Sequence, residues 1–223
     1  MINVLHGNIF NSRCQCIVNT INCVGVMGAG IAYEYRLRYP EMYQKYVELC
    51  NTRLLDIGKL WIYKPKKIDD KWVLNFPTKY HWKYESKPEY LEKGLQKFLD
   101  TYSERGITSI AFPLLGTTNG GIPESVSIGI MKKYLEKCNI PVEIYYFDAN
   151  AYDDLFLRFK DLWHSFSEQE LAKMSGLRID FVKKIKSALE KENIRSFSRL
   201  LTEKGIGDVT LEKSFHFIYN YNE

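Results

Sequence analysis

The chain has 223 residues, of which 45% are hydrophobic and 26% are charged, a balance that excludes a disordered or collagen-like protein. At roughly 150 residues per domain, this length predicts one medium domain and an appendage of about half a domain. Basic residues exceed acidic ones by 31 to 27, and the whole excess lies in residues 1–150. Such an excess permits an anionic ligand but is far below the charge density of a histone-like nucleic-acid binder.

The cysteines and the first residues indicate a reduced, cytoplasmic protein. The five cysteines are unevenly spaced without a Cys-x-x-Cys, and the four histidines are well separated, so neither a disulfide framework nor a zinc site is predicted. The first residues lack a basic segment followed by an apolar one, and no apolar run approaches the roughly 20 residues that span a bilayer. We therefore expect no membrane interaction, no metal and no cofactor.

Residues 1–150 alternate between strand-like and helix-like segments. Strands are predicted over 2–5, 16–19, 60–63, 72–76, 107–112 and 142–147, and helices over 30–38, 41–50, 88–104 and 123–138. The charged segment 64–71 is predicted to be a solvated loop that joins two strands of a hairpin. This alternation predicts an α/β fold in which helices cover both faces of a sheet.

After Asn150 the pattern becomes nearly all-helical, so we expect one domain over 1–150 and a helical region over 151–223. Ser167-Glu-Gln-Glu170 fits a capping box, Gly176 fits a turn, and 181–192 has helical periodicity. The spacing around Gly176 also fits a helix-turn-helix. In that case a set of basic side chains would face phosphate, namely Arg178, Lys183, Lys184 and Lys186. Because 151–223 carries no net charge, a scaffold or partner-docking role is favoured over DNA binding.

Two glycine-rich loops each follow a predicted strand and precede a predicted helix. They are Gly25-Val-Met-Gly-Ala-Gly30 and Gly116-Thr-Thr-Asn-Gly-Gly121. Glycines let backbone N–H groups approach an anion, and a helix N-terminus adds partial positive charge. Tyr33 stands where a dinucleotide fingerprint needs its third glycine, and no Gly-Lys-Ser/Thr is present. We expect the two loops to face one another across a diphosphate. For either loop taken alone, the alternative is that its glycines serve only to form a turn.

Four motifs then occur in one order: Gly7-Asn-Ile9, Val18-Asn-Thr-Ile-Asn-Cys-Val-Gly-Val-Met-Gly-Ala-Gly-Ile-Ala32, Asn75-Phe-Pro-Thr-Lys-Tyr-His-Trp82 and Pro113-Leu-Leu-Gly116. Over about residues 1–148 the sequence resembles the macrodomain family. Within that family it resembles the branch of the DarG antitoxins, which remove ADP-ribose from DNA, and of the terminal ADP-ribose glycohydrolase. The resemblance implies a three-layer α/β fold with a mixed, mostly parallel sheet. A small all-α region that the resemblance does not cover would follow it.

The resemblance also implies an ADP-ribose site. Asn8 and Ile9 would meet the adenine, Phe147 would stack on it, and Asn22 would bond the distal ribose. Many macrodomains have aspartate where this chain has Asn8, which weakens the expected contact to the adenine amino group. The first loop would surround the distal ribose and its phosphate through Gly28, Ala29, Gly30 and Ile31. The second would hold the diphosphate through Gly116, Thr117, Thr118, Asn119 and Gly120.

By the same resemblance, Lys79 matches the lysine that this branch uses for catalysis. The terminal glycohydrolase pairs its lysine with an aspartate in the second loop, but here the nearest match is Gly120. No acid lies between Gly116 and Pro123. This departure favours a DNA-directed enzyme and leaves the general acid without a candidate.

The segment from Lys79 to Tyr84 carries the expected chemistry. An amine whose pKa is lowered by partial desolvation can open the ribose and form a Schiff-base adduct. Basic and aromatic side chains alternate after it, so we expect Tyr80, His81 or Trp82 to stack on bases and Lys83 to lie near phosphate. Alternatively, Trp82 and Tyr84 pack under the following helix, and His81 is a hydrogen-bonded structural histidine.

Together, these expectations predict an ADP-ribosyl glycohydrolase that removes ADP-ribose from ADP-ribosylated DNA. Its expected role is that of an antitoxin whose partner is a DNA ADP-ribosyltransferase toxin. Two alternatives stay open. One is a hydrolase that acts on ADP-ribosylated protein side chains or on an ester such as O-acetyl-ADP-ribose. The other is a non-catalytic module that reads ADP-ribose.

Overall fold

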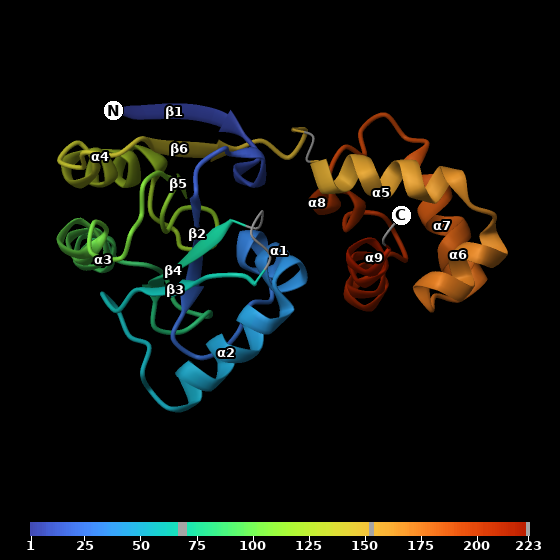
Figure 1. Ribbon diagram of the computed structural model, residues 1–223, viewed down its shortest axis with the longest axis horizontal. Helices are drawn as coiled ribbons and strands as arrows, with labels where there is room; N and C mark the ends of the chain where they lie inside the picture. Colours follow the sequence, from blue (N-terminus) through green and yellow to red (C-terminus); the bar gives the residue numbers. More distant parts are fainter. Residues whose placement is uncertain (67–70, 152–153, 222–223) are drawn as a thin grey trace. The chain divides into compact units, whose positions relative to one another are not determined.

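The computed structural model describes residues 1–66, 71–151 and 154–221 (Figure 1). The chain divides into two units, Met1–Phe147 and Asp148–Glu223. Of the charged segment 64–71 that was predicted to be a loop, residues 67–70 lie outside the described residues.

The first unit is built on a six-stranded sheet in the order β1-β6-β5-β2-β4-β3. The strands are β1 (Ile2–Gly7), β2 (Cys16–Asn22), β3 (Trp61–Tyr63), β4 (Trp72–Lys79), β5 (Ile110–Pro113) and β6 (Val142–Phe147). All neighbours are parallel except β3 and β4, which form the predicted hairpin with Ile62 opposite Leu74. The expected mixed, mostly parallel sheet is confirmed.

Helices cover both faces of this sheet, as Figure 1 shows. The helices of the first unit are α1 (Gly30–Arg38), α2 (Pro40–Asn51), α3 (Pro88–Thr101), α4 (Glu124–Leu135) and the short 3-10 helix η1 (Ile9–Asn11). One core packs α3 and α4 on the sheet and includes Leu95, Met131 and Phe112. The other packs α1 and α2 on the opposite face, through Tyr35 and Tyr46. This is the expected three-layer arrangement.

Several element boundaries differ from the sequence prediction: β1, β2 and β4 extend two or three residues further, and α4 ends at Leu135 and not at Cys138. The helix predicted over 88–104 ends at Thr101, and the strand predicted from Ile107 begins at Ile110. The reason is that the N–H of Ile107 donates to the carbonyl of Tyr102 at 3.0 Å and closes the end of α3. Ile107 is therefore buried as part of a helix-terminating turn, although its side chain is typical of a strand.

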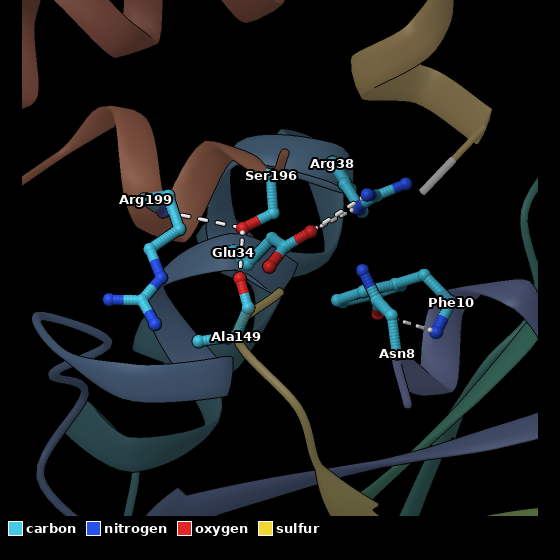
Figure 2. A network of polar contacts seen from close by, with 7 residues as sticks. All are labelled: Asn8, Phe10, Glu34, Arg38, Ala149, Ser196 and Arg199. Carbon is cyan, nitrogen blue, oxygen red and sulfur yellow. Dashed lines mark hydrogen bonds and ion pairs between the residues drawn. The ribbon is translucent and has the colours of Figure 1, made fainter. Parts of the chain in front are cut away.

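The second unit is all-helical. Its helices are α5 (Asp154–Ser165), α6 (Glu168–Ser175), α7 (Ile179–Leu189), α8 (Phe197–Leu200) and α9 (Asp208–Asn220). The predicted capping box of Ser167 and Glu170 begins α6, and Gly176 ends it in a left-handed conformation. Ser196 caps α8 by accepting from the N–H of Arg199 (Figure 2). An aromatic cluster fills the core, with Phe156, Phe159, Trp163, Phe197 and Phe215.

No helix in the described part of the chain has both the length and the apolar character needed to cross a membrane.

Candidate functional site

The sheet brings the predicted site residues to one edge. Because β1, β6, β5, β2 and β4 are parallel neighbours in that order, their carboxyl ends lie side by side. From one strand to the next, these ends are Gly7, Phe147, Pro113, Asn22 and Lys79. Ligands of open α/β sheets bind outside the carboxyl ends of the strands, where the connecting loops leave the sheet. Residues that are more than 130 positions apart in the sequence thus line one row.

At one end of the row, Phe147 lies beside the start of the Gly7-Asn8-Ile9 motif, because β1 and β6 pair Gly7 with Phe147. The ring of Phe147 is exposed, and Asn8 and Ile9 are buried. The side-chain oxygen of Asn8 accepts a hydrogen bond from the N–H of Phe10 at 3.0 Å and caps η1 (Figure 2). An exposed aromatic ring at a strand end is a stacking platform for a flat base.

The first loop is held in place by the side chain of Asn22. Its amide nitrogen donates to the carbonyl of Val26 at 2.6 Å, and its oxygen accepts from the N–H of Val24 at 3.0 Å. The buried hydroxyl of Tyr46 donates to the backbone and side-chain oxygens of Asn22 at 2.9 and 3.0 Å. Asn22 therefore organises the turn that leads to the loop glycines, and the expected ribose contact stays a prediction.

The loop ends in the first turn of α1, with Gly28, Ala29 and Gly30 exposed. No side chain caps this helix. In the part of the chain that the structure describes, the backbone N–H groups of these three residues and of Ile31 have no protein acceptor. Unpaired amides at a helix N-terminus attract an anion, since the helix dipole adds partial positive charge there.

The two glycine loops meet at Gly30 and Asn119. A Cβ atom on Gly30, whose φ is +57°, would lie 2.6 Å from the amide nitrogen of Asn119. Gly120 likewise has no room for a side chain, because an added Cβ atom would lie 2.2 Å from the carbonyl oxygen of Gly116. Within this described loop, a run of backbone N–H groups has no protein acceptor, those of Gly116, Thr117, Thr118 and Asn119. The second loop thus also presents amides to an anion.

Lys79 ends β4 between the two loops, and only 8% of its surface is exposed. A bulge between Ile21 and Asn22 shifts the pairing so that Asn22 lies opposite Lys79. The ammonium of Lys79 donates a hydrogen bond to the backbone carbonyl of Asn119. Burial lowers the pKa of Lys79 below its usual 10.5, and the negative charge of Glu85 offsets part of that effect. A lowered pKa increases the neutral, nucleophilic fraction of the amine.

The segment from Tyr80 to Ser86 is attached to both loops. The N–H of Cys23 donates to the carbonyl of Tyr80 at 3.0 Å, and the N–H of Ser86 donates to the carbonyl of Gly120 at 2.8 Å. Between these anchors, Trp82 and Tyr84 are 51% and 68% exposed, which contradicts the alternative in which they pack under α3. The segment therefore presents aromatic surface next to Lys79.

His81 holds the turn inside this segment. Its Nδ1 accepts from the N–H of Lys83 at 3.2 Å, and its ring stacks on Trp82 with the centroids 5.4 Å apart. The ammonium of Lys83 lies 5.1 Å from the Trp82 ring. These contacts support the structural alternative for His81, and they place a cation and an aromatic ring together at the surface.

Glu85 is a site residue that the sequence reasoning missed. Its carboxylate lies 3.3 Å from where a Cβ atom on Gly121 would stand, so it lies against the second loop. It also supplies the negative charge that acts on Lys79. No acid lies between Gly116 and Pro123 in the sequence, and the carboxylate beside this loop comes from a segment about 35 positions earlier. No local pattern around Glu85 could have assigned it to that loop.

Other nucleophiles and metal ligands near the site are poor candidates. Cys23 is close to the first loop, but burial, together with the nearby charge of Asp56, raises the pKa of its thiol to about 12. A thiol of that pKa is almost entirely protonated near neutral pH and is a weak nucleophile. Among the described residues, no group of three or more His, Cys, Asp or Glu side chains is placed to hold a metal ion.

This fold and site are those of a macrodomain. The profile of the Macro domain family matches residues 18–131, just over half of the chain, and the chain belongs to this family.

Among curated proteins, the chain is similar to those named DNA ADP-ribosyl glycohydrolase. The Thermus aquaticus protein is 38% identical over 124 residues, which are 55% of this chain and 34% of that protein. The Mycobacterium tuberculosis protein is 37% identical over 147 residues, 65% of this chain and 42% of that protein. A Thermosipho africanus "DNA ADP-ribosyl transferase-DNA ADP-ribosyl glycohydrolase fusion protein" is 35% identical over 160 residues, covering 65% and 41%. The chain thus spans less than half the length of these relatives.

Solved structures agree with the fold. The macrodomain of Mycobacterium tuberculosis DarG has a TM-score of 0.63 at 35% identity, covering 65% of this chain and 97% of that one. Thermosipho africanus DarTG in complex with ADP-ribose has a TM-score of 0.62 at 36% identity, covering 66% and 42%. The resemblance stated from sequence motifs is confirmed for the first unit.

Proposed function

We propose that this protein is a glycohydrolase that removes ADP-ribose from ADP-ribosylated DNA. The observation that carries the proposal is Lys79, a buried lysine of lowered pKa held against the second glycine loop at the sheet edge. Similarity to proteins named DNA ADP-ribosyl glycohydrolase supports DNA as the carrier of the modification.

In this proposal ADP-ribose lies along the row of strand ends. Its adenine stacks on exposed Phe147 and meets Asn8 and Ile9. Its diphosphate accepts hydrogen bonds from the unpaired amides of residues 116–119, and the distal ribose lies beside the first loop near Asn22. The anomeric carbon then faces Lys79. A related Thermosipho africanus structure that carries ADP-ribose supports the choice of ligand.

Lys79 would act as the nucleophile. Its neutral amine attacks the anomeric carbon, the bond to the DNA base breaks, and the base leaves with the electron pair and takes up a proton. Water then hydrolyses the lysine–sugar adduct, which releases ADP-ribose and restores the amine. The carboxylate of Glu85, whose charge acts on Lys79, lies against the second loop, where the sequence itself has no acid.

The exposed aromatic side chains after Lys79 would hold the DNA. Tyr80, Trp82 and Tyr84 offer stacking surface for bases that flank the modified one, and Lys83 offers a charge to a phosphate. An enzyme that acts on a modified base needs that base exposed, which a single strand or a flipped base provides.

We further propose that the protein reverses the action of a DNA ADP-ribosyltransferase toxin. The support is the relative whose printed name joins a DNA ADP-ribosyl transferase and a DNA ADP-ribosyl glycohydrolase in one chain. A direct complex with such a toxin is part of this proposal.

The test compares two substrates in parallel: an ADP-ribosylated oligonucleotide and a protein ADP-ribosylated on acidic side chains. We expect release of ADP-ribose from the DNA, loss of release in Lys79→Ala and Lys79→Met, and retained ADP-ribose binding by calorimetry in both variants. Release from the protein alone would overturn DNA as the substrate. Binding without release from either substrate would make the protein a reader, and full activity of the variants would remove Lys79 from the mechanism.

A further inference from the structure

A hollow of about 300 Å³ in the second unit is lined by charged and hydroxyl-bearing side chains together with two apolar ones. Its walls come from α7, from the residues after α7, and from the connection between α8 and α9. The charged and hydroxyl-bearing lining residues are Lys183, Lys184, Ser187, Lys191, Glu203 and Lys204. Ala188 and Ile206 are the apolar ones. The site proposed above in the first unit does not use any of these residues.

The hollow has a higher ratio of basic to acidic residues than the second unit as a whole. Residues 151–223 contain 12 basic and 12 acidic side chains and are neutral overall. Four of those 12 basic residues line the hollow, against one of the 12 acidic ones. Four ammonium groups around one concavity create a local positive potential, although the unit as a whole is neutral. Such a potential attracts anions.

These ammonium groups are available to a ligand. Among the residues that the structure describes, neither Lys184 nor Lys204 has an acidic partner. Lys183 pairs with Glu168 at 3.6 Å and Lys191 pairs with Glu203, but both pairs lie at the surface. Exposed pairs contribute little and exchange readily with a competing anion.

The Lys184 ammonium lies between the Phe181 ring, whose centroid is 5.1 Å away, and the backbone of the α8–α9 connection. A Cβ atom on Gly205, whose φ is +87°, would lie 2.9 Å from the Lys184 ammonium nitrogen. The absence of a side chain at Gly205 therefore leaves the space that this ammonium occupies.

The chemistry of the lining selects one class of ligand. Lysine ammonium groups and serine hydroxyls are common partners of phosphate oxygens. A stacked base needs an aromatic ring, which this lining does not supply. Several lysines around one concavity match a ligand that carries repeated negative charges. We propose that the hollow binds the phosphodiester backbone of a nucleic acid, without reading its bases.

This site differs from the helix-turn-helix surface that the sequence indicated. Arg178 is paired with Asp180 at 3.1 Å, and Lys186 donates to the carbonyl of Phe166 at 2.8 Å. Neither lines the hollow. Lys191 and Lys204, which the helix-turn-helix spacing did not include, take their place beside Lys183 and Lys184.

The test measures binding of an unmodified, fluorescently labelled oligothymidylate to the full chain, with saturating ADP-ribose in the first unit and Trp82→Ala in every variant to remove the stacking surface proposed there. Lys184→Glu/Lys204→Glu removes the two unpaired lysines. The charge-matched control, Lys160→Glu/Lys173→Glu, changes two lysines of the same unit outside the hollow. Lys184→Gln/Lys204→Gln serves as a milder variant if charge reversal impairs folding, which circular dichroism reports.

We expect the hollow variant to lose at least about tenfold in affinity near 0.1 M salt, and the control to change less than about twofold. The slope of log affinity against log salt should fall by about 1.4 in the hollow variant, since each single-strand phosphate contact contributes about 0.7. Equal losses in both double variants would overturn the proposal, as would no loss in the hollow variant. Binding of polyglutamate but not of the oligonucleotide would identify an acidic protein partner instead and would also overturn it.

Discussion

The ammonium of Lys79 donates a hydrogen bond to the backbone carbonyl of Asn119, and this contact joins the end of β4 to the second glycine loop. Lys79 and Asn119 are 40 residues apart in the sequence. The bond fixes the amine at the junction of the two loops while burial lowers its pKa. The proposed nucleophile is thereby positioned beside the amides that we propose to hold the diphosphate.

The rate of ADP-ribose release should rise with pH. In the proposed mechanism the neutral amine of Lys79 is the reactive form, and its fraction grows as the pH passes upward through a pKa that burial has moved below 10.5. We expect kcat to follow a single rising limb with its midpoint below that value. Lys79→Arg should be inactive across the range, because a guanidinium does not lose its proton. A rate that falls or stays level as the pH rises would contradict the role of the amine.

Removing the charge of Glu85 should move that limb to lower pH. Glu85 raises the pKa of Lys79, so Glu85→Gln lets burial lower it further. The control is Glu89→Gln, because Glu89 is exposed in the first turn of α3 and does not shift the pKa of Lys79. Measured rate–pH profiles of the two variants should differ, with only Glu85→Gln shifted. An unchanged midpoint in Glu85→Gln would show that its charge does not reach the amine.

A methyl group on Gly120 should disrupt the second loop. The added Cβ would lie 2.2 Å from the Gly116 carbonyl and 2.6 Å from the hydroxyl of Ser86, so the loop must move. We expect Gly120→Ala to weaken ADP-ribose binding at least tenfold in calorimetry and to lower the free energy of unfolding by about 1–3 kcal/mol.

Gly129→Ala is the matched control for that variant. Gly129 is an exposed residue of α4 with no atom within 4 Å of its added Cβ. The substitution should raise stability by about 0.5–1 kcal/mol and leave ADP-ribose affinity unchanged, because alanine favours a helix more than glycine does. Equal affinities of the two variants would count against the tight loop as the diphosphate site.

Tyr46→Phe tests whether Asn22 supports ADP-ribose binding by holding the first loop in place, because it leaves the Asn22 side chain itself unchanged. The Tyr46 hydroxyl donates to both oxygens of Asn22, and its loss should loosen the first loop and cost about 1 kcal/mol of stability. Tyr35→Phe removes a buried hydroxyl that donates to the Val18 carbonyl at 3.1 Å, within the core. Both should lower the unfolding free energy similarly, but only Tyr46→Phe should weaken ADP-ribose binding. If neither changes affinity, the loop does not depend on this bond.

Trp82→Ala should affect long substrates selectively. Stacking of a base on an aromatic side chain contributes about 1–3 kcal/mol, which corresponds to roughly 5- to 150-fold in kcat/KM. We expect that loss for an ADP-ribosylated oligonucleotide and no loss for an ADP-ribosylated mononucleotide, since the latter has no flanking base. Equal losses on both substrates would mean that Trp82 contacts the modified nucleotide itself.

Much of the first unit could be predicted from local pattern. The helix over 30–38 and the strand over 142–147 occur as predicted, because apolar periodicity, Pro40 and the flanking polar residues are properties of neighbouring positions. The glycine loops and the motif around Lys79 were also visible, since their chemistry is contained in short segments. For the same reason the α6 capping box was identified from four residues.

The sequence by itself thus determined the class of fold, the two anion-ready loops and the candidate nucleophile. Only the tertiary structure decided what surrounds them: the bulge that sets Asn22 opposite Lys79, the Tyr46 hydroxyl behind Asn22, and Glu85 beside Gly121. It likewise placed Lys191 and Lys204 beside Lys184 in one hollow. Each of these relationships joins segments that meet through strand register or helix packing, which depends on the whole core and leaves no pattern in either segment alone.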